Sequence, residues 1–365
     1  CQRFHINIAC RYLYCSRASL RIPSYHFIGD EAYDLLLLGG YRVSLQSLLQ
    51  RLSLDSEQRK DVYQDCGFGD DQEDLLLSRT ELEQVRQALR KSRIYREYVE
   101  RKSKDAYQNT IAYLRQEGLF AQETVAIVDS GWTGSMQRSL RQLLKSDGFQ
   151  GKLIGFYFGM YARPKSPEDG TYLTWYFEQS SRARYKIPFC NNLFECLLSA
   201  PHGMTLGYCV RDGLYVPDMF PKPPKTQLEQ IQSHIDLVLQ YTKTRLKQVA
   251  FQDFNEMVYR RDTGRRITRY MAHPSREEAS YYGEIFFCDD TTEAYHLRLA
   301  DQGQTTALKG YSIPARIWRR LFGKRKYVTP ELFWPYGTIA FLPAWKQWWY
   351  RWNVYVWEWI RYALH

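Results

Sequence analysis

The sequence lacks the patterns that usually mark a structural metal site or a disulfide-stabilised secreted domain. Its 8 cysteines include no C-x-x-C pair, and none has a histidine partner at zinc-ligand spacing. We therefore expect no metal held by protein ligands, and reduced, mostly buried thiols typical of a cytoplasmic protein. The sequence contains no run of 18 apolar residues and no visible signal peptide, so it predicts no membrane-spanning segment.

Two further absences exclude particular architectures and one enzyme activity. There is no internal repeat or low-complexity tract, which excludes solenoids and disordered linkers as the main architecture. There is no Asp-x-Asp motif of the kind that phosphatases use as nucleophile and acid, so we expect no phosphatase activity. What is present is a 44% apolar chain with 29 Tyr, 10 Trp and a formal charge of +10, which favours an anionic partner.

The stretch Thr124–Leu144 organises the chain. The apolar run Val125–Val128 predicts a strand buried on both faces, and this strand ends on Asp129. A tight turn follows over Ser130–Ser135, and leucines at helical spacing then predict a helix. A strand, a small polar loop and a helix N-terminus form a common anion site, because free N–H groups and the helix dipole face the ligand. The alternative is an ordinary βα turn.

Other elements are expected on either side of this stretch. Cys10–Ser16 predicts a first strand, and Thr80 with Glu83 predicts the capped start of a helix that runs to about Leu114, with a break. Two strands, Lys152–Met160 and Gly170–Phe177, and a hairpin turning at Asp212-Gly213 follow. Pro221–Pro224 is the clearest linker signal.

The C-terminus has a composition of its own. A basic cluster is followed by tryptophans at helical spacing, which suits a helix lying in a lipid headgroup layer. The alternative is a helix packed on its own domain. The basic cluster is Arg316, Arg319, Arg320, Lys324, Arg325 and Lys326, and the tryptophans are Trp345, Trp348, Trp349, Trp352, Trp357 and Trp359.

Several stretches, in this order along the chain, carry a family resemblance. They are Tyr12–Arg17, Asp129–Gln137, Phe194–Gly203, Pro274–Ala279, Phe286–Asp290 and Phe333–Pro335. They resemble the phosphoribosyltransferase module of bacterial capsule and O-antigen clusters, which is often linked to a HAD-type phosphatase. The loop itself is similar to the ribosyl-phosphate loop of type I phosphoribosyltransferases, with Ser130 in place of the usual second acid.

The resemblance implies a fold and a reaction. The fold is α/β, with a phosphoribosyltransferase-like (Rossmann-like), mostly parallel sheet over residues 1–220 and a mainly helical C-terminal region over 225–365. The reaction is transfer of ribose 5-phosphate from phosphoribosyl diphosphate to a glycan or lipid-linked glycan acceptor. The family's first strand and diphosphate loop are not seen, so we expect this sequence to begin downstream of them and to bind donor weakly or be inactive.

The resemblance also implies roles for residues. The catalytic candidates are Asp129, which would face the ribose hydroxyls, and Glu195, which would act as the base. Ser16 and Arg17 would bind the diphosphate, while His202 and Gly203 would line the acceptor site. The remaining substrate-binding candidates are Ser130, Gly131, Trp132, Thr133, Gly134, Ser135 and Gln137.

The expected partners follow from that reaction. They are Mg²⁺ held mainly by the diphosphate, a HAD-type phosphatase on the same or a separate chain, and no nucleic acid. We expect a cytoplasmic location, with peripheral contact at the inner face of the membrane. Two alternatives stay open: a nucleotide-sugar glycosyltransferase, and a degenerate non-catalytic partner of the phosphatase.

Overall fold

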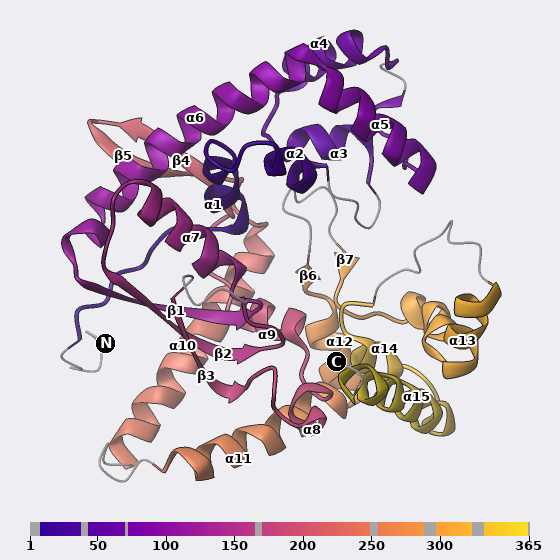
Figure 1. The fold of residues 1–365 in the computed structure, drawn as a ribbon. Helices are drawn as coiled ribbons and strands as arrows, with labels where there is room; N and C mark the ends of the chain where they lie inside the picture. Colours follow the sequence, from indigo (N-terminus) through magenta and orange to yellow (C-terminus); the bar gives the residue numbers. More distant parts are fainter. Residues whose placement is uncertain are drawn as a thin grey trace.

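The computed structural model describes residues 8–37, 43–69, 72–164, 170–248, 255–287, 297–322 and 332–363. Within these ranges the chain is α/β: mainly helical, with one three-stranded parallel sheet and two short antiparallel pairs (Figure 1). The helices are α1 (Arg17–Ser24), α2 (Glu31–Leu36), α3 (Leu45–Gln50), α4 (Ser56–Cys66), α5 (Arg79–Lys91), α6 (Arg93–Gln116), α7 (Ser135–Ser146), α8 (Ala183–Lys186), α9 (Asn191–Leu197), α10 (Lys225–Gln248), α11 (Glu256–Ile267), α12 (Arg276–Gly283), α13 (Ile313–Phe322), α14 (Pro335–Ile339) and α15 (Ala344–Ala363). The strands are β1 (Thr124–Trp132), β2 (Lys152–Met160), β3 (Thr171–Phe177), β4 (Thr205–Arg211), β5 (Leu214–Met219), β6 (Phe286–Phe287) and β7 (Leu297–Arg298).

The parallel sheet has the order β1-β2-β3, and α7 connects β1 to β2. Val125 and Ile127 point to the side of the sheet that packs on α6 and α7. On the opposite face Val128 is 83% exposed, and its register neighbour Phe156 is 45% exposed. The prediction of a strand buried on both faces is therefore wrong. The alternation of buried and exposed residues is that of a sheet covered on one side at these positions.

The predicted strand at Cys10–Ser16 is also wrong. Residues 8–16 run without regular secondary structure, and α1 begins at Arg17. Ser16 ends the segment because its hydroxyl accepts a hydrogen bond from the Ser19 N–H while the Ser19 hydroxyl accepts one from the Ser16 N–H. The backbone of Tyr14 is bonded to tyrosine hydroxyls instead of a strand partner: its N–H donates to Tyr113 and its carbonyl accepts from Tyr208.

The long helix predicted from Thr80 is two helices, α5 and α6. The break lies at Ser92, whose backbone is extended and whose hydroxyl accepts from the Tyr95 N–H, so one serine both ends α5 and caps α6. The cap of α5 is Ser78 with Glu81, not Thr80 with Glu83. The 24-residue α6 links the upper helical layer, α2 to α5, to the sheet (Figure 1).

The C-terminal helices pack on the α/β part. The largest hydrophobic cluster joins Phe177 and Leu193 to Met271, Trp334 and Val354, which lie beyond the Pro221–Pro224 segment. The antiparallel pair β4–β5 turns at Asp212 and Gly213, both with positive φ, as predicted for a type I′ hairpin. In the part of the chain that is described, no helix combines the length and apolarity needed to cross a bilayer.

Candidate functional site

The loop after β1, which lies at the edge of the described three-stranded sheet and not at its centre, is shorter than predicted. β1 continues through Ser130 and Gly131 to Trp132, so the turn itself is Thr133-Gly134, and α7 begins at Ser135. Gly131 and Gly134 have φ of +123° and +66°, and Trp132, a bulky residue, has +83°. A Cβ on Gly131 would lie 2.1 Å from the carbonyl oxygen of Gly159 on β2, so the close strand approach requires glycine.

The N-terminus of α7 has the geometry expected of an anion site. Gly134 occupies the N-cap without a side-chain hydrogen bond, so the cap itself supplies no acceptor to the first-turn N–H groups. Thr133 is exposed and its hydroxyl lies 3.4 Å from that of Ser135. Packing gives Gly134 a second reason to be glycine, because a Cβ would lie 2.5 Å from the ring of Tyr172.

Asp129 lies on the α7 side of β1, four residues before the turn. Burial raises the pKa of its carboxyl group, and hydrogen bonds from the Ser130 and Gly131 N–H groups and the Ser130 hydroxyl oppose that rise. Among the described residues it has no Lys or Arg ion-pair partner. Burial together with Asp129 raises the pKa of Cys15 to about 12, so this neighbour is a neutral thiol at pH 7. The Asp129 carboxyl group is thus largely buried, bonded to Ser130 and Gly131, and next to a neutral thiol.

Gln137 is fully buried and connects α7 to the sheet. Its side-chain oxygen accepts from the Tyr157 hydroxyl at 2.6 Å, and its side-chain nitrogen donates to the Thr171 carbonyl at 3.1 Å. These contacts give Gln137 a packing role beneath the loop. Its position at the start of a helix does not reveal that role, because the partners lie on β2 and β3.

The segment Tyr12–Arg17 runs from the loop to the predicted acceptor residues. The Tyr12 hydroxyl lies 2.9 Å from Nε2 of His202, and the buried Ser16 hydroxyl donates to the Thr205 carbonyl at 2.5 Å. The Ser16 hydroxyl is therefore bonded within the protein. Arg17 is exposed in the first turn of α1 and not at the end of a strand.

Glu195, on α9, contacts the loop directly. Its carboxylate accepts a hydrogen bond from the indole Nε1–H of Trp132, whose ring also packs on Phe189 and Phe194. The start of α9 is anchored from the C-terminal region, because the carbonyl of Phe333 accepts from the Asn192 side chain at 3.0 Å. The positions of Glu195 and of the loop are thus coupled to the Phe333–Pro335 segment.

A pocket of about 680 Å³ lies beside α9, with Cys196 in its lining and Glu195 outside it. It is lined by His202 and Gly203, by the Pro221–Pro224 segment, and by Phe286 and His234 among others. His234 is only 8% exposed, and neither ring nitrogen has a hydrogen-bond partner among the described residues. Burial lowers the pKa of its imidazole. Nothing in the sequence distinguishes His234 from any other histidine on an amphipathic helix.

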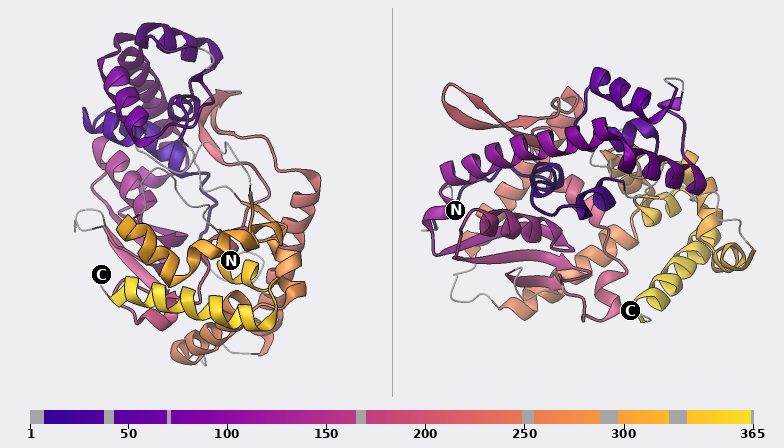
Figure 2. Two further views of the ribbon diagram at one scale, coloured as in Figure 1. Left: turned by 90° about the vertical axis from the view of Figure 1, so that its right-hand side faces the viewer. Right: turned by 45° about the horizontal axis from the view of Figure 1, so that its top comes forward.

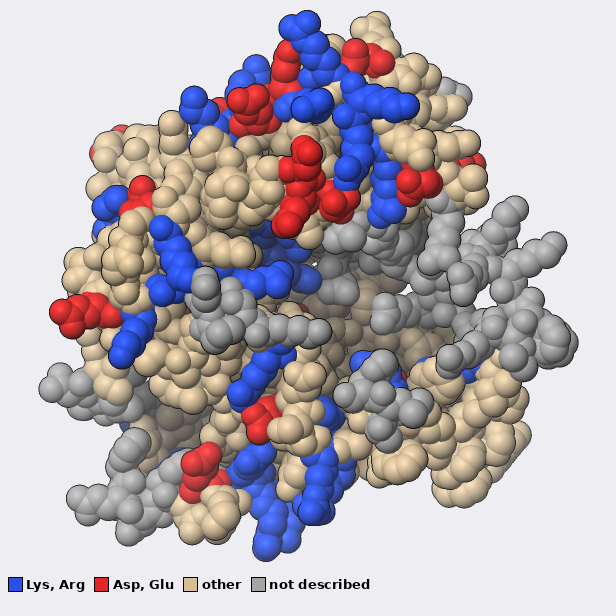
Figure 3. All heavy atoms as spheres, viewed as in Figure 1, with Lys and Arg blue, Asp and Glu red and all other residues tan. Residues whose placement is uncertain are grey.

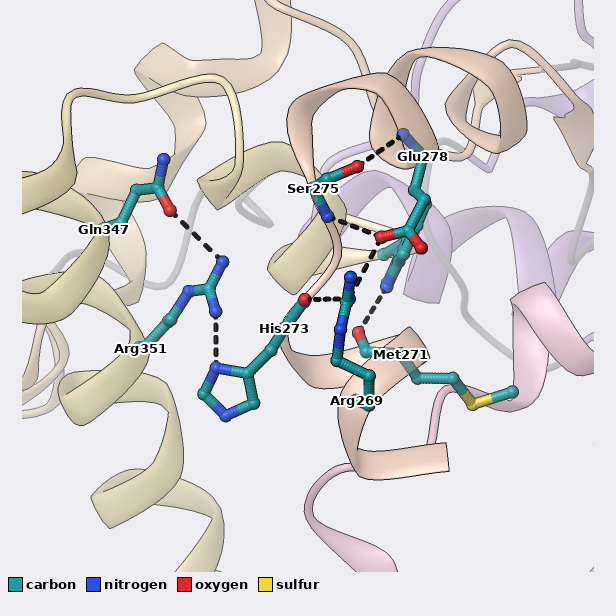
Figure 4. Close-up of polar contacts among 8 residues, drawn as sticks. Arg269, Met271, His273, Ser275, Glu278, Gln347 and Arg351 are labelled. Atoms are coloured by element: carbon teal, nitrogen blue, oxygen red, sulfur yellow. Dashed lines mark hydrogen bonds and ion pairs between the residues drawn. The ribbon is translucent and has the colours of Figure 1, made fainter. Parts of the chain in front are cut away.

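The Pro274–Ala279 stretch has a structural role that Figure 4 makes plain. Ser275 and Glu278 form a capping box at the start of α12, and Arg269 bridges Glu278 and the carbonyl of His273. Arg351 of α15 donates to Nδ1 of His273 at 2.6 Å, so this ring is neutral at that nitrogen. His273, the residue before the stretch, thereby links α15 to α12 and Arg269.

Of the two carboxylates near the loop, Glu195 is bonded to Trp132, and Asp129 is the one that the Mg²⁺ expected with the donor could contact. No group of three or more His, Cys, Asp or Glu that could hold a metal ion occurs among the described residues, and part of the Phe286–Asp290 stretch, residues 288–290, lies outside them. A single carboxylate fits an ion whose remaining ligands come from a diphosphate and water.

Comparison with known proteins assigns the chain to no family. It matches no protein-family model, and no curated protein matches it significantly.

Proposed function

We propose that the chain is a glycosyltransferase of the phosphoribosyltransferase type, which moves ribose 5-phosphate from phosphoribosyl diphosphate to a glycan acceptor. One observation carries the proposal: segments far apart in sequence, 12–17, 129–132 and 195–205, interact with one another beside the end of β1. They overlap three of the six stretches that carry the family resemblance, and Thr205 lies just beyond the third of these. An ordinary βα turn gives no reason for the three to meet.

In this proposal each group has one task. The N–H groups of the first turn of α7, with Thr133 and Ser135, bind the 5-phosphate, and Asp129 accepts hydrogen bonds from the ribose hydroxyls. Arg17 contributes charge for the diphosphate. Mg²⁺, when bound with the donor, would neutralise diphosphate charge beside Asp129. Positioning and electrostatics then supply most of the acceleration.

The acceptor binds beside Glu195, on the side of α9 that contacts Trp132, and His202 and Gly203 line its approach. Glu195 is the candidate base, and the hydrogen bond from Trp132 fixes the orientation of its carboxylate. The acceptor hydroxyl attacks C1 of the ribose, the C1–O bond to the diphosphate breaks, and the hydroxyl proton passes to the base. The product keeps its 5-phosphate for a separate HAD-type phosphatase.

Donor titration tests the proposal. Asp129→Asn should weaken binding of phosphoribosyl diphosphate with Mg²⁺ by about ten- to a hundredfold, because a charged hydrogen bond contributes roughly 1.5–3 kcal/mol. Ser139→Ala, on the second turn of α7, is the control and should keep parental affinity. The measurement is isothermal titration, with thermal melting to confirm that both variants fold.

The alternatives predict different titrations. A nucleotide-sugar glycosyltransferase would bind a nucleoside diphosphate in place of phosphoribosyl diphosphate. A non-catalytic partner of the phosphatase would bind neither donor. Equal donor affinity for the parental chain and Asp129→Asn would leave the loop as a βα turn and end the proposal.

A further inference from the structure

The C-terminal helix α15 exposes an aromatic face. Its exposed large side chains are Trp345 (71%), Trp348 (69%), Trp349 (41%), Trp352 (47%), Tyr355 (46%) and Trp359 (51%). Spacings of three and four residues place them on one side of the helix, over about 21 Å of its length. Solvent-exposed helix faces are normally charged or polar, whereas this exposed face is aromatic.

The opposite side of α15 is occupied by the protein itself. Val354 and Asn353 are buried, and the Asn353 side chain accepts from the Ile313 N–H at 2.8 Å. Arg351 is held by His273 and Gln347. The helix is therefore fixed by its inner side, and the aromatic side is held outward without being needed for packing.

The charged side chains near this face are mostly positive. The only acid in the sequence of α15 is Glu358, which pairs with Arg361 at 3.2 Å. Two described basic residues lie on the rings of α15: Arg316 of α13, the helix beside α15, lies over Trp357, and Lys346 lies over Trp345 (Figure 2). In Figure 3 the surface at the lower right, where α15 lies, is mostly uncharged, with Lys and Arg atoms at its upper margin. An uncharged aromatic face beside basic residues complements a layer of anionic headgroups over an apolar interior.

We propose that the aromatic face of α15 docks onto the surface of an anionic lipid bilayer, with the helix lying in the plane of the interface. The residue type selects lipid over a second protein helix: five of the six side chains are Trp, which concentrates at bilayer interfaces, whereas helix-pairing seams use Leu and Ile. The inference does not rest on the proposed transferase activity.

Vesicle binding by the full chain tests it. The probe is vesicles of phosphatidylcholine with phosphatidylglycerol, and pure phosphatidylcholine vesicles measure the charge contribution. Trp348→Gln and Trp352→Gln should each lower the partition coefficient about tenfold, because each removes an interfacial aromatic surface. Tyr281→Gln, on α12, removes an aromatic side chain that is 55% exposed elsewhere and should leave binding unchanged. Thermal melting checks that all three variants fold.

A second readout reports insertion directly. Tryptophan emission should shift to shorter wavelength on vesicle binding and be quenched by brominated lipid, and both effects should shrink in the Trp348→Gln/Trp352→Gln double variant. Parental vesicle binding by the double variant would overturn the proposal. A second result would also overturn the proposal: the parental chain does not bind vesicles but sediments as a dimer, and the double variant sediments as a monomer. The aromatic face would then contact a second copy of the chain and not lipid. Donor titration is independent of both results.

Discussion

At the turn between β1 and α7, some residues are free to contact a ligand and others are needed for packing. Thr133 and Ser135 face the start of α7, and Thr133 is exposed. Gly134 lies against Tyr172 and Met160, so its substitution tests the fold before it tests any ligand. A branched side chain such as Val at position 134 would clash with these neighbours and require a strained φ. The informative changes at this loop are therefore the two hydroxyl residues.

We predict that the double variant Thr133→Val/Ser135→Ala binds phosphoribosyl diphosphate about tenfold more weakly, since each lost hydrogen bond is worth about 0.5–1.5 kcal/mol. Its melting temperature should stay close to the parental value, because the two hydroxyls lie 3.4 Å apart and form only a weak hydrogen bond with each other. Titration and melting on the same samples measure the two effects. Gly134→Val should instead show a clear loss of melting temperature, and parental stability in that variant would contradict the packing described here.

At the scale of elements, the C-terminal region fixes the helix that carries Glu195. Trp334 is fully buried in the shared core and its indole N–H donates to the Met271 carbonyl at 2.8 Å. Its neighbour Phe333 supplies the carbonyl bonded to Asn192 at the start of α9. A substitution of Trp334 should consequently loosen both the packing of the shared core and the position of α9.

Trp334→Phe tests that connection. It leaves the Met271 carbonyl buried without its partner and opens a small cavity, so we expect a loss of roughly 1–4 kcal/mol in the free energy of unfolding. Denaturant unfolding measures it, and Trp345→Phe, at an exposed position of the same residue type, is the matched control and should change little. Equal stability of the two variants would show that the buried indole is not anchored as described.

For the whole molecule, local signals predicted local structure well. Apolar spacing and turn chemistry predicted the strand at 152–160, a strand at 170–177 that begins at Thr171, a helix after the loop that begins one residue earlier than expected, at Ser135, and the turn at Asp212-Gly213. The failures depend on partners distant in sequence. Residues 10–16 look like a strand, but tyrosine hydroxyls of Tyr113 and Tyr208 take the place of a neighbouring strand.

In the candidate site, too, the contacts that could not be predicted are those between residues distant in sequence. The family resemblance selected stretches that contain most of the residues that meet here. The sequence could not reveal that Gln137 is bonded to Tyr157 and Thr171, that the Ser16 hydroxyl is bonded to Thr205, or that Glu195 does not line the pocket. Those facts depend on how α7, α9 and β4 pack, which no local pattern encodes.

The buried imidazole of His234, which has no hydrogen-bond partner in the described part of the chain, makes the protein acid-sensitive. Burial holds its pKa below the ordinary value of 6.5, so as the pH falls through 6.5 the unfolded chain takes up a proton that the folded chain resists. The free energy of unfolding must then decrease from pH 6.5 down to the lower, folded-state pKa, and this contribution is absent above about pH 7. Melting at pH 7.5 and 5.5 should show a smaller difference for His234→Gln than for the parental chain. An unchanged difference would mean that the ring gains a partner on protonation.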